Sequence, residues 1–449
     1  MAKLTPYGGA GTATGANFLL EIASKKVLID CGMLQGVSTA KEFNAREFEY
    51  DPASIDFLFI THAHIDHIGL IPRLVKSGFK GKIYSTPETK AISELLLLDA
   101  AKISAHNLNA EPLYSPADVE KSLGMWETYA YHSPKEFGGF TVELFNSGHV
   151  MGSAMVKFST SSGRNMLFTG DLGNSPSPLL PDIEKMSGLK YLLMESVYGD
   201  RNHEDKRERD KKFERVVRET IERGGTLLIP AFSLERTQVM LHMLNNLFES
   251  GKLPQVPVFL DSPLGIRITQ IYERVKDLYN DKTEAEIKGG DNIFRFDKLR
   301  ETASVRDSRE IAEVPGAKII IAGSGMSTAG RILQHEEMFL PDPSATLLLV
   351  GYQGTGTLGR ELEEGRKKVI IDDHQVEVRA RVEKISGFSS HADSNTLVDF
   401  VSTSAKTLEK VFVAMGEPKS SIFLAQRLRD ELEVDAVVAE KGKTYELDL

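Results

Sequence analysis

The chain has 449 residues, of which 41% are hydrophobic and 26% charged, close to the average for folded globular proteins. Its 54 Lys and Arg against 64 Asp and Glu give a formal net charge of −10, so the composition lacks the basic excess of a protein that coats nucleic acid non-specifically. A single cysteine, Cys31, excludes an internal disulfide and a cysteine-based zinc cluster. Any metal must therefore be held by His, Asp and Glu.

The length exceeds what one hydrophobic core usually supports, so we expect two domains, or one domain interrupted by another. No stretch approaches the roughly 20 apolar residues that cross a bilayer. The N-terminal sequence MAKLTPYGGAGTATGANFLL also lacks the basic start, apolar block and cleavage site of a secretion signal. These features predict a soluble, cytoplasmic protein with no membrane partner.

Short apolar runs rich in β-branched residues recur along the chain and predict buried strands. In chain order they are 27–30, 57–60, 166–171, 191–196, 226–230, 258–261, 319–323, 346–351 and 411–415. Segments 206–223, 236–250 and 331–340 have the spacing of helices. This alternation predicts an α/β fold, in which sites form at the carboxyl ends of strands.

The segment THAHIDH (61–67) is the strongest functional signal, because packing rarely requires three imidazoles and a carboxylate in one short loop. In a tight loop, His62 and His64 can point to one side, and Asp66 and His67 to the other, which gives two groups of nitrogen and oxygen ligands. Further ligands must come from elsewhere. The candidates, both in Gly-flanked turns, are His149 in SGHVMGS and Asp171 in TGDLG. The sequence therefore predicts a metal-dependent hydrolase.

Together these residues resemble the four motifs of the metallo-β-lactamase superfamily, with Asp30 in LIDCG as the first motif. Further segments resemble the β-CASP branch of that superfamily, which comprises ribonucleases of the messenger-RNA 3′-processing type and bacterial relatives. They are Glu195 in LLMESVYGDRNH, His391 in GFSSHADS, PAFSLERTQ (230–238), LDSPLG (260–265), SGMSTAGR (324–331) and GYQGTGTLGR (351–360). The resemblance covers essentially the whole chain.

The resemblance implies an αββα sandwich formed by about residues 1–207 and 379–449, with an α/β β-CASP domain inserted over 208–378. The active site would lie in the cleft between them. It also implies the short bacterial form, without an extra RNA-binding module.

The resemblance further implies two zinc ions that activate a water and clamp the scissile phosphate of RNA, with endonucleolytic or 5′-exonucleolytic cleavage. Asp66 would belong to the catalytic centre as a ligand, and Asp30 would hold the ligand loop. Glu195 and His391 would supply the proton for the leaving oxygen.

Gly-rich stretches at 323–330 and 351–359 are candidates for phosphate binding, because backbone N–H groups and guanidinium groups bind phosphate oxygens. Ordinary tight turns are the alternative. The candidate residues are Ser324, Gly325, Arg331, Gly356 and Arg360.

Met415 departs from the family pattern, since the usual residue there is a His that binds the second metal. A thioether is a poor zinc ligand beside imidazole and carboxylate, so we expect one or two zinc ions, with the second weak or replaceable by manganese. DNA-processing relatives also lack this His. The alternatives to an RNA nuclease are therefore a nuclease acting on single-stranded DNA and a weakly active RNA-binding scaffold; a small-molecule hydrolase suits the long insertion less well. A homodimer is a further open alternative.

Overall fold

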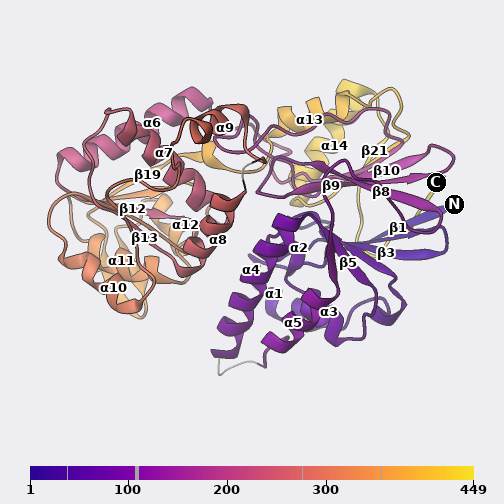
Figure 1. Ribbon diagram of the computed structural model, residues 1–449, viewed down its shortest axis with the longest axis horizontal. Coiled ribbons are helices and arrows are strands. Elements are labelled where there is room, and N and C mark those ends of the chain that lie inside the picture. Colours follow the sequence, from indigo (N-terminus) through magenta and orange to yellow (C-terminus); the bar gives the residue numbers. More distant parts are fainter. Residues whose placement is uncertain (38, 107–110, 276, 355) are drawn as a thin grey trace. The chain divides into compact units, whose positions relative to one another are not determined.

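The computed structural model describes residues 1–449 except 38, 107–110, 276 and 355. This described part divides into two compact units, residues 1–202 with 391–449, and residues 203–390. Both units contain helices and strands (Figure 1), so the predicted α/β class is confirmed.

Among the described residues, the first unit contains a pair of β-sheets, A and B. Sheet A has the strand order β22-β1-β2-β3-β4-β5-β6. Its strands are β1 (Ala2–Gly8), β2 (Asn17–Ile22), β3 (Lys25–Ile29), β4 (Phe57–Phe59), β5 (Lys82–Ser85), β6 (Trp126–Thr128) and β22 (Tyr445–Leu447). Strands β3 to β6 are parallel, whereas β1 pairs antiparallel with both β2 and β22.

Sheet B has the strand order β21-β20-β11-β10-β9-β8-β7. Its strands are β7 (Lys135–Glu136), β8 (Phe140–Asn146), β9 (Ala154–Thr160), β10 (Asn165–Phe168), β11 (Tyr191–Met194), β20 (Lys410–Val413) and β21 (Ala436–Val438). Strands β7 to β10 are antiparallel neighbours, and β10, β11, β20 and β21 are parallel neighbours. The segment after residue 391 thus adds strands to a sheet begun much earlier in the chain.

The main core of this unit lies between the two sheets. Phe18 and Phe59 of sheet A share one buried cluster with Phe158 and Phe168 of sheet B. The ring centroids of Phe59 and Phe158 are 5.5 Å apart in an edge-to-face arrangement, a favoured geometry for aromatic pairs. The sequence of strand β8 shows how this core forms. Apolar residues occupy every second position and are buried, because alternate side chains of a strand point to the same face.

Helices cover the outer face of each sheet, so the layers are α, β, β and α, as the resemblance predicts (Figure 1). Leu28 of sheet A packs with Leu74 and Leu97 of the covering helices, and on the other side Leu192 of sheet B packs with Leu424. The helices of this unit are α1 (Ala40–Ala45), η1 (Pro52–Ser54), α2 (Ile65–Ile68), α3 (Ile71–Lys76), α4 (Pro87–His106), α5 (Pro116–Gly124), α13 (Ser394–Ser402) and α14 (Pro418–Leu432).

The second unit is built on sheet C, whose strand order is β14-β13-β15-β12-β16-β19 and whose ladders are parallel. Its strands are β12 (Thr226–Pro230), β13 (Val258–Asp261), β14 (Leu299–Glu301), β15 (Lys318–Ala322), β16 (Thr346–Leu349) and β19 (Arg381–Lys384), and a separate hairpin consists of β17 (Lys368–Ile371) and β18 (His374–Glu377). Strand β19 pairs with β16 and so belongs to this unit, although the resemblance assigns residues 379–449 to the first domain. The domain limits implied by the resemblance stay a prediction.

Helices flank the strands of sheet C, and several of them begin at a residue whose side chain caps the helix. In α6 (Lys206–Glu222), the Asp205 carboxylate accepts hydrogen bonds from the N–H groups of Arg207 and Glu208, and Phe213, Val216 and Val217 are buried at helical spacing. The other helices of this unit are α7 (Arg236–Glu249), α8 (Pro263–Arg274), α9 (Asp281–Lys288), α10 (Val305–Glu310), η2 (Ile311–Glu313), α11 (Arg331–Phe339), α12 (Leu358–Glu363) and η3 (Ser386–Phe388).

The three helices predicted from the sequence are confirmed as α6, α7 and α11. In the part of the chain that the structure describes, no helix has both the length and the apolar character needed to span a bilayer.

Candidate metal centre

The predicted metal ligands follow strands of sheets A and B: His62, His64, His149 and Asp171 lie in loops, and Asp66 and His67 lie in the short helix α2. The segment 62–67 follows β4, and Asp171 follows β10. His149 lies in the connection between β8 and β9. Because parallel strands end at the same edge of a sheet, ligands from distant parts of the sequence come together there.

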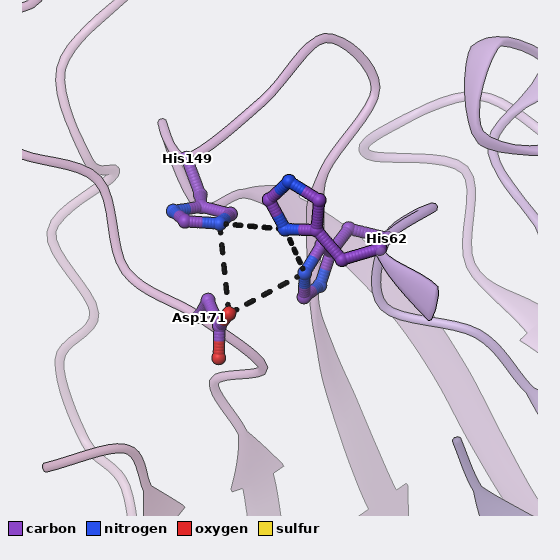
Figure 2. Close-up of side chains that lie close together, drawn as sticks. His62, His149 and Asp171 are labelled. Atoms are coloured by element: carbon purple, nitrogen blue, oxygen red, sulfur yellow. Dashed lines mark hydrogen bonds and ion pairs between the residues drawn. The ribbon is translucent and has the colours of Figure 1, made fainter. Parts of the chain in front are cut away.

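Four of these residues, called site 1, gather their donor atoms in one place: His62, His64, His149 and Asp171. The Nδ1 atom of His64 lies 3.1 Å from His62 Nε2 and 3.2 Å from His149 Nε2. The Oδ2 atom of Asp171 lies 3.4 Å from His62 Nε2 and 3.5 Å from His149 Nε2 (Figure 2). Neighbouring ligands that lie about 2.0–2.1 Å from one metal ion are about 3.3–3.4 Å apart in a tetrahedral site, which is close to these four distances. All four donor atoms lie within 4.8 Å of one another, so the side chains of site 1 could hold a divalent metal ion.

The protonation states in site 1 suit metal binding. Burial lowers the pKa of His64 and His149 well below its usual value, and neighbouring imidazoles lower it further. Both rings are therefore neutral, which is the form that binds metals. Burial opposes ionisation of Asp171, but the nearby His67 and His62 outweigh it and hold the pKa of the carboxyl well below its usual range. The group is thus three imidazoles and one carboxylate.

Asp66, His67 and Asp171 form a looser group, called site 2. His67 Nε2 lies 3.4 Å from Asp171 Oδ1 and 3.9 Å from Asp66 Oδ2. Among the described residues, His67 Nε2 and Asp171 Oδ1 are buried and have no hydrogen-bond partner. Buried polar atoms without partners are costly, and a cation between them would remove that cost. These two atoms are therefore candidate metal ligands, but the donor atoms of site 2 do not gather as closely as those of site 1.

Asp30 holds the ligand loop from the end of β3. Its Oδ1 accepts a hydrogen bond from the Thr61 N–H at 2.8 Å, and its Oδ2 lies 2.7 Å from His67 Nδ1. Because the carboxylate can only accept, His67 Nδ1 carries a hydrogen, which leaves Nε2 as the ring nitrogen available to a metal of site 2. Asp30 has a φ of +60°, a left-handed conformation that Asp tolerates better than most residues. The geometry matches the supporting role expected for Asp30.

Glu195 and His391 meet although 195 residues separate them in the sequence. His391 Nδ1 lies 3.3 Å from Glu195 Oε1 and 3.9 Å from Asp171 Oδ2. Backbone N–H groups of Leu172 and Val197 donate to the two Glu195 oxygens, at 2.7 and 3.2 Å. Burial disfavours a charged imidazole, but the carboxylates of Glu195 and Asp171 outweigh it and raise the pKa of His391 to about 9. His391 therefore holds a proton beside the metal sites.

Met415 follows β20 and is buried in the core between sheets A and B. It has a φ of +44°. A small cavity separates it from site 2. The cavity is lined by Met415, by the polar residues Asp30, Thr61, His67 and Glu195, and by Phe18, Ile29, Phe168, Gly170 and Leu193. The residue that departs from the family pattern thus lines the same cavity as His67 of site 2.

The two arginines among the predicted phosphate contacts have partners within the second unit. Arg331 Nη1 donates to Asp261 Oδ1 at 2.6 Å and to the Thr302 carbonyl at 2.8 Å, and Nη2 donates to the Ala303 carbonyl. Arg360 Nε donates to Glu364 at 2.7 Å. Phosphate binding by these side chains stays a prediction, and it would compete with these partners.

The remaining phosphate candidates lie in loops that follow strands of sheet C. Ser324 Oγ accepts a hydrogen bond from the Thr328 N–H at 3.0 Å, and the Phe232 ring lies against Gly325. Gly356 has a φ of +82° and is exposed. Phosphate binding by these residues stays a prediction, with ordinary tight turns as the alternative.

Two residues with clear roles in this site were not singled out from the sequence. A Cβ atom at Gly32 would collide with the Asp66 carbonyl, so glycine allows the ligand loop to approach strand β3. The Thr61 hydroxyl contacts both Asp30 and His62. The only indication of these roles in the sequence was that Gly32 lies close to Asp30 and Thr61 directly precedes His62. The contacts themselves depend on how β3 and β4 pair, which the sequence does not show.

Comparison with known proteins supports the resemblance. The chain matches a metallo-beta-lactamase superfamily model over residues 13–217 and a Beta-Casp domain model over residues 237–362. A third model, described as a Zn-dependent metallo-hydrolase RNA specificity domain, matches residues 375–439. The chain is 34% identical to Ribonuclease TTHA0252 of Thermus thermophilus over 92% of this chain and 95% of that protein. The chain belongs to the β-CASP ribonuclease branch of the metallo-β-lactamase superfamily.

Other β-CASP relatives are similar over nearly the full chain. An RNase J-like protein of Methanocaldococcus jannaschii is 31% identical over 98% of this chain and 99% of that protein. Transcription termination factor FttA of Methanosarcina mazei is 30% identical over 96% of this chain and 70% of that protein. A crystal structure of a protein of unknown function from Enterococcus faecalis V583 has a TM-score of 0.59 at 11% identity, covers 99% of this chain and all of that chain, and supports the fold.

Membership in the β-CASP branch makes this chain a metal-dependent nuclease, a hydrolase acting on phosphodiester bonds. A divalent metal is therefore part of the centre, and the ligand geometry of site 1 fits it. The assignment of individual ligands stays a prediction.

Proposed function

We propose that the chain is a zinc-dependent ribonuclease whose centre is formed by site 1, site 2 and the Glu195–His391 pair. The single observation that carries this proposal is that the four donor atoms of site 1 lie within 4.8 Å of one another, with a protonated His391 next to them. RNA as the substrate is supported by the names of two relatives similar over nearly the full chain, a ribonuclease and an RNase J-like protein. Both endonucleolytic and 5′-exonucleolytic cleavage fit this proposal.

Zinc is the proposed metal because site 1 offers three imidazole nitrogens and one carboxylate oxygen, and such a mixed set favours zinc over magnesium or calcium. When bound, the metal lowers the pKa of a water toward neutrality and supplies positive charge for the phosphate. Neutral His64 and His149 keep their lone pairs directed at that metal, and Asp171 neutralises part of its charge.

The proton for the leaving oxygen comes from His391 in this proposal. Its Nδ1 is oriented by Glu195, so the opposite ring nitrogen can face a substrate. Glu195 is fixed in turn by the backbone N–H groups of Leu172 and Val197. General acid catalysis of this kind typically contributes about 10²–10⁴-fold to the rate.

Site 2 is proposed to bind its metal more weakly than site 1. It has one imidazole and two carboxylates, and the neighbouring Met415 adds only a thioether. An oxygen-rich site shifts preference toward harder ions such as manganese or magnesium. We therefore expect the number of tightly bound zinc ions per chain in the purified protein to be closer to one than to two.

The proposed setting is the cytoplasm, which agrees with the buried free thiol of Cys31. Size-exclusion chromatography with light scattering distinguishes a monomer from a homodimer.

Cleavage of matched substrates tests the proposal. Purified protein is incubated with 5′-labelled single-stranded RNA and DNA of the same sequence, after removal of metal and after addition of zinc. We expect zinc-dependent RNA cleavage that His64→Ala abolishes while the fold is retained, because His64 contacts both other imidazoles of site 1. The product ladder separates endonuclease from exonuclease activity.

Each other outcome identifies a different function. Preferential DNA cleavage would replace the ribonuclease proposal with a DNA-directed nuclease. RNA binding without cleavage at any metal concentration would indicate that the protein is an RNA-binding scaffold and not a nuclease. Full activity in the metal-free protein would overturn the metal-dependent mechanism.

A further inference from the structure

The Thr61 hydroxyl lies at the meeting point of the motifs that build the metal centre. Its Oγ1 is 2.8 Å from Asp30 Oδ2, 3.1 Å from His62 Nδ1 and 3.4 Å from His67 Nδ1. All four residues are almost completely buried, so no bulk water competes for these contacts. One hydroxyl therefore touches a ring nitrogen from each metal site.

The number of hydrogens available fixes the direction of these hydrogen bonds. The Asp30 carboxylate only accepts, so the single hydrogen of the Thr61 hydroxyl must go to Asp30 Oδ2. Thr61 Oγ1 is left with lone pairs, and it can contact His62 Nδ1 favourably only as an acceptor. His62 must then carry its hydrogen on Nδ1. Its Nε2 is left with the lone pair, and this is the atom that faces His64 and Asp171.

Packing holds the hydroxyl in this position. A Cβ atom at Gly170 would lie 2.6 Å from Thr61 Cβ and 2.7 Å from Thr61 Oγ1, well inside van der Waals contact. Gly170 therefore leaves room for the Thr61 side chain, and the next residue in the chain is Asp171. The Thr61 backbone is also fixed, because its N–H donates to Asp30 and its carbonyl accepts from the Ala154 N–H at 2.7 Å. The hydroxyl has little freedom to turn elsewhere.

We propose that Thr61 is a positioning residue that fixes the Nδ1-protonated tautomer of His62 and so presents His62 Nε2 to the metal of site 1. The inference rests on the proposed zinc site but not on the identity of the substrate. Loss of the hydroxyl would leave the His62 Nδ1 hydrogen buried without an acceptor, and the other tautomer would become accessible. That tautomer places a hydrogen where the metal must bind.

Zinc affinity of two matched variants tests this role. Thr61→Val keeps the shape but removes the hydroxyl, whereas Thr61→Ser keeps the hydroxyl and removes the methyl group. Zinc affinity is measured by competition with a chelator, and melting temperatures are measured with and without zinc. We expect Thr61→Val to bind zinc about 10–100-fold more weakly, as is typical when the hydrogen-bond partner of a metal-binding His is lost. Thr61→Ser should retain most of the affinity.

Thr220→Val is the control for replacing a buried threonine, because the Thr220 hydroxyl bonds the Val216 carbonyl and Thr346 within the second unit. It should lower the melting temperature without changing zinc affinity. Parental zinc affinity in Thr61→Val would overturn the proposal, and so would equal losses in Thr61→Ser and Thr61→Val. If the protein cleaves no RNA but Thr61→Val still weakens zinc binding, the ribonuclease proposal fails and this inference stands.

Discussion

Met415 and Gly9 are held against each other at the edge of the core between sheets A and B. The Met415 N–H donates to the Gly9 carbonyl at 2.6 Å, and a Cβ atom at Gly9 would collide with Met415 Sδ. Gly9 also has a φ of +68°, which favours glycine. The contact fixes the Met415 side chain beside the cavity that adjoins His67.

We predict that Met415→His strengthens metal binding at site 2, because an imidazole at this position adds the nitrogen ligand that Met415 does not provide. Elemental analysis should show zinc rising from nearer one to nearer two equivalents per chain. Met415→Leu is the matched control, since it fills similar space without a ligand atom and should keep the parental stoichiometry. If the parental protein held two zinc ions tightly, a thioether at this position would not lower the metal affinity of site 2, and the prediction would be wrong.

We predict that Gly32→Ala weakens both metal binding and stability. Any side chain at position 32 would run into the Asp66 carbonyl, while the neighbouring Cys31 N–H is bonded to the His67 carbonyl. The ligand loop must then shift, and overpacking of this kind typically costs about 1–3 kcal/mol. Urea denaturation and zinc competition measure the two effects. Gly124→Ala has open space around the new Cβ, so it should leave zinc affinity unchanged and should not lower stability.

We predict that His391→Ala slows RNA cleavage by about 10²–10⁴-fold in single-turnover measurements, because proton donation acts in the transition state. RNA affinity should change much less. Glu195→Gln removes the charge that orients His391 and should reduce the rate in the same direction. His374, an exposed histidine paired with Glu337, provides the control variant His374→Ala. A loss of affinity with an unchanged single-turnover rate would contradict the role given to His391.

We predict that Glu336 makes the stability of the protein fall as the pH rises. Glu336 is completely buried, its Oε1 accepts a hydrogen bond from Ser327 Oγ at 2.5 Å, and burial raises its pKa to about 8. An unfolded chain releases this proton near the ordinary pKa of 4.5, whereas the folded chain keeps it up to about 8. Between these pH values the folded state binds more protons, so the free energy of unfolding decreases as the pH increases.

Glu336→Gln should remove this pH dependence, because the amide has a similar shape and no charge. The difference between the parental protein and the variant should reach the order of a few kcal/mol across that window, in favour of the variant at higher pH. Urea denaturation at pH 5, 6.5 and 8 measures it. Glu313→Gln, at an exposed position, should keep the parental pH dependence. Identical pH profiles for the parental protein and Glu336→Gln would exclude the effect.

The sequence alone determined the class of structure and the chemistry of the centre. Buried strands and amphipathic helices have characteristic spacings of apolar residues, and these spacings are local, so α6, α7 and α11 were predicted within one residue of their ends. The HxHxDH loop was equally readable, because clustered imidazoles and carboxylates have few explanations besides metal. Met415 could be recognised as a departure from the family pattern only because the order of the motifs along the chain showed which position it occupies.

Only the tertiary structure decided which polar atoms meet. Arg331 was a candidate phosphate ligand, but Asp261, 70 residues away, accepts its hydrogen bond. The Thr61 hydroxyl reaches Asp30 because β3 and β4 pair in parallel in one particular register. Hydrogen bonds and metal sites require distances between segments far apart in sequence to be correct to within a few tenths of an ångström. Local spacing does not contain those distances, because strand pairing and core packing set them.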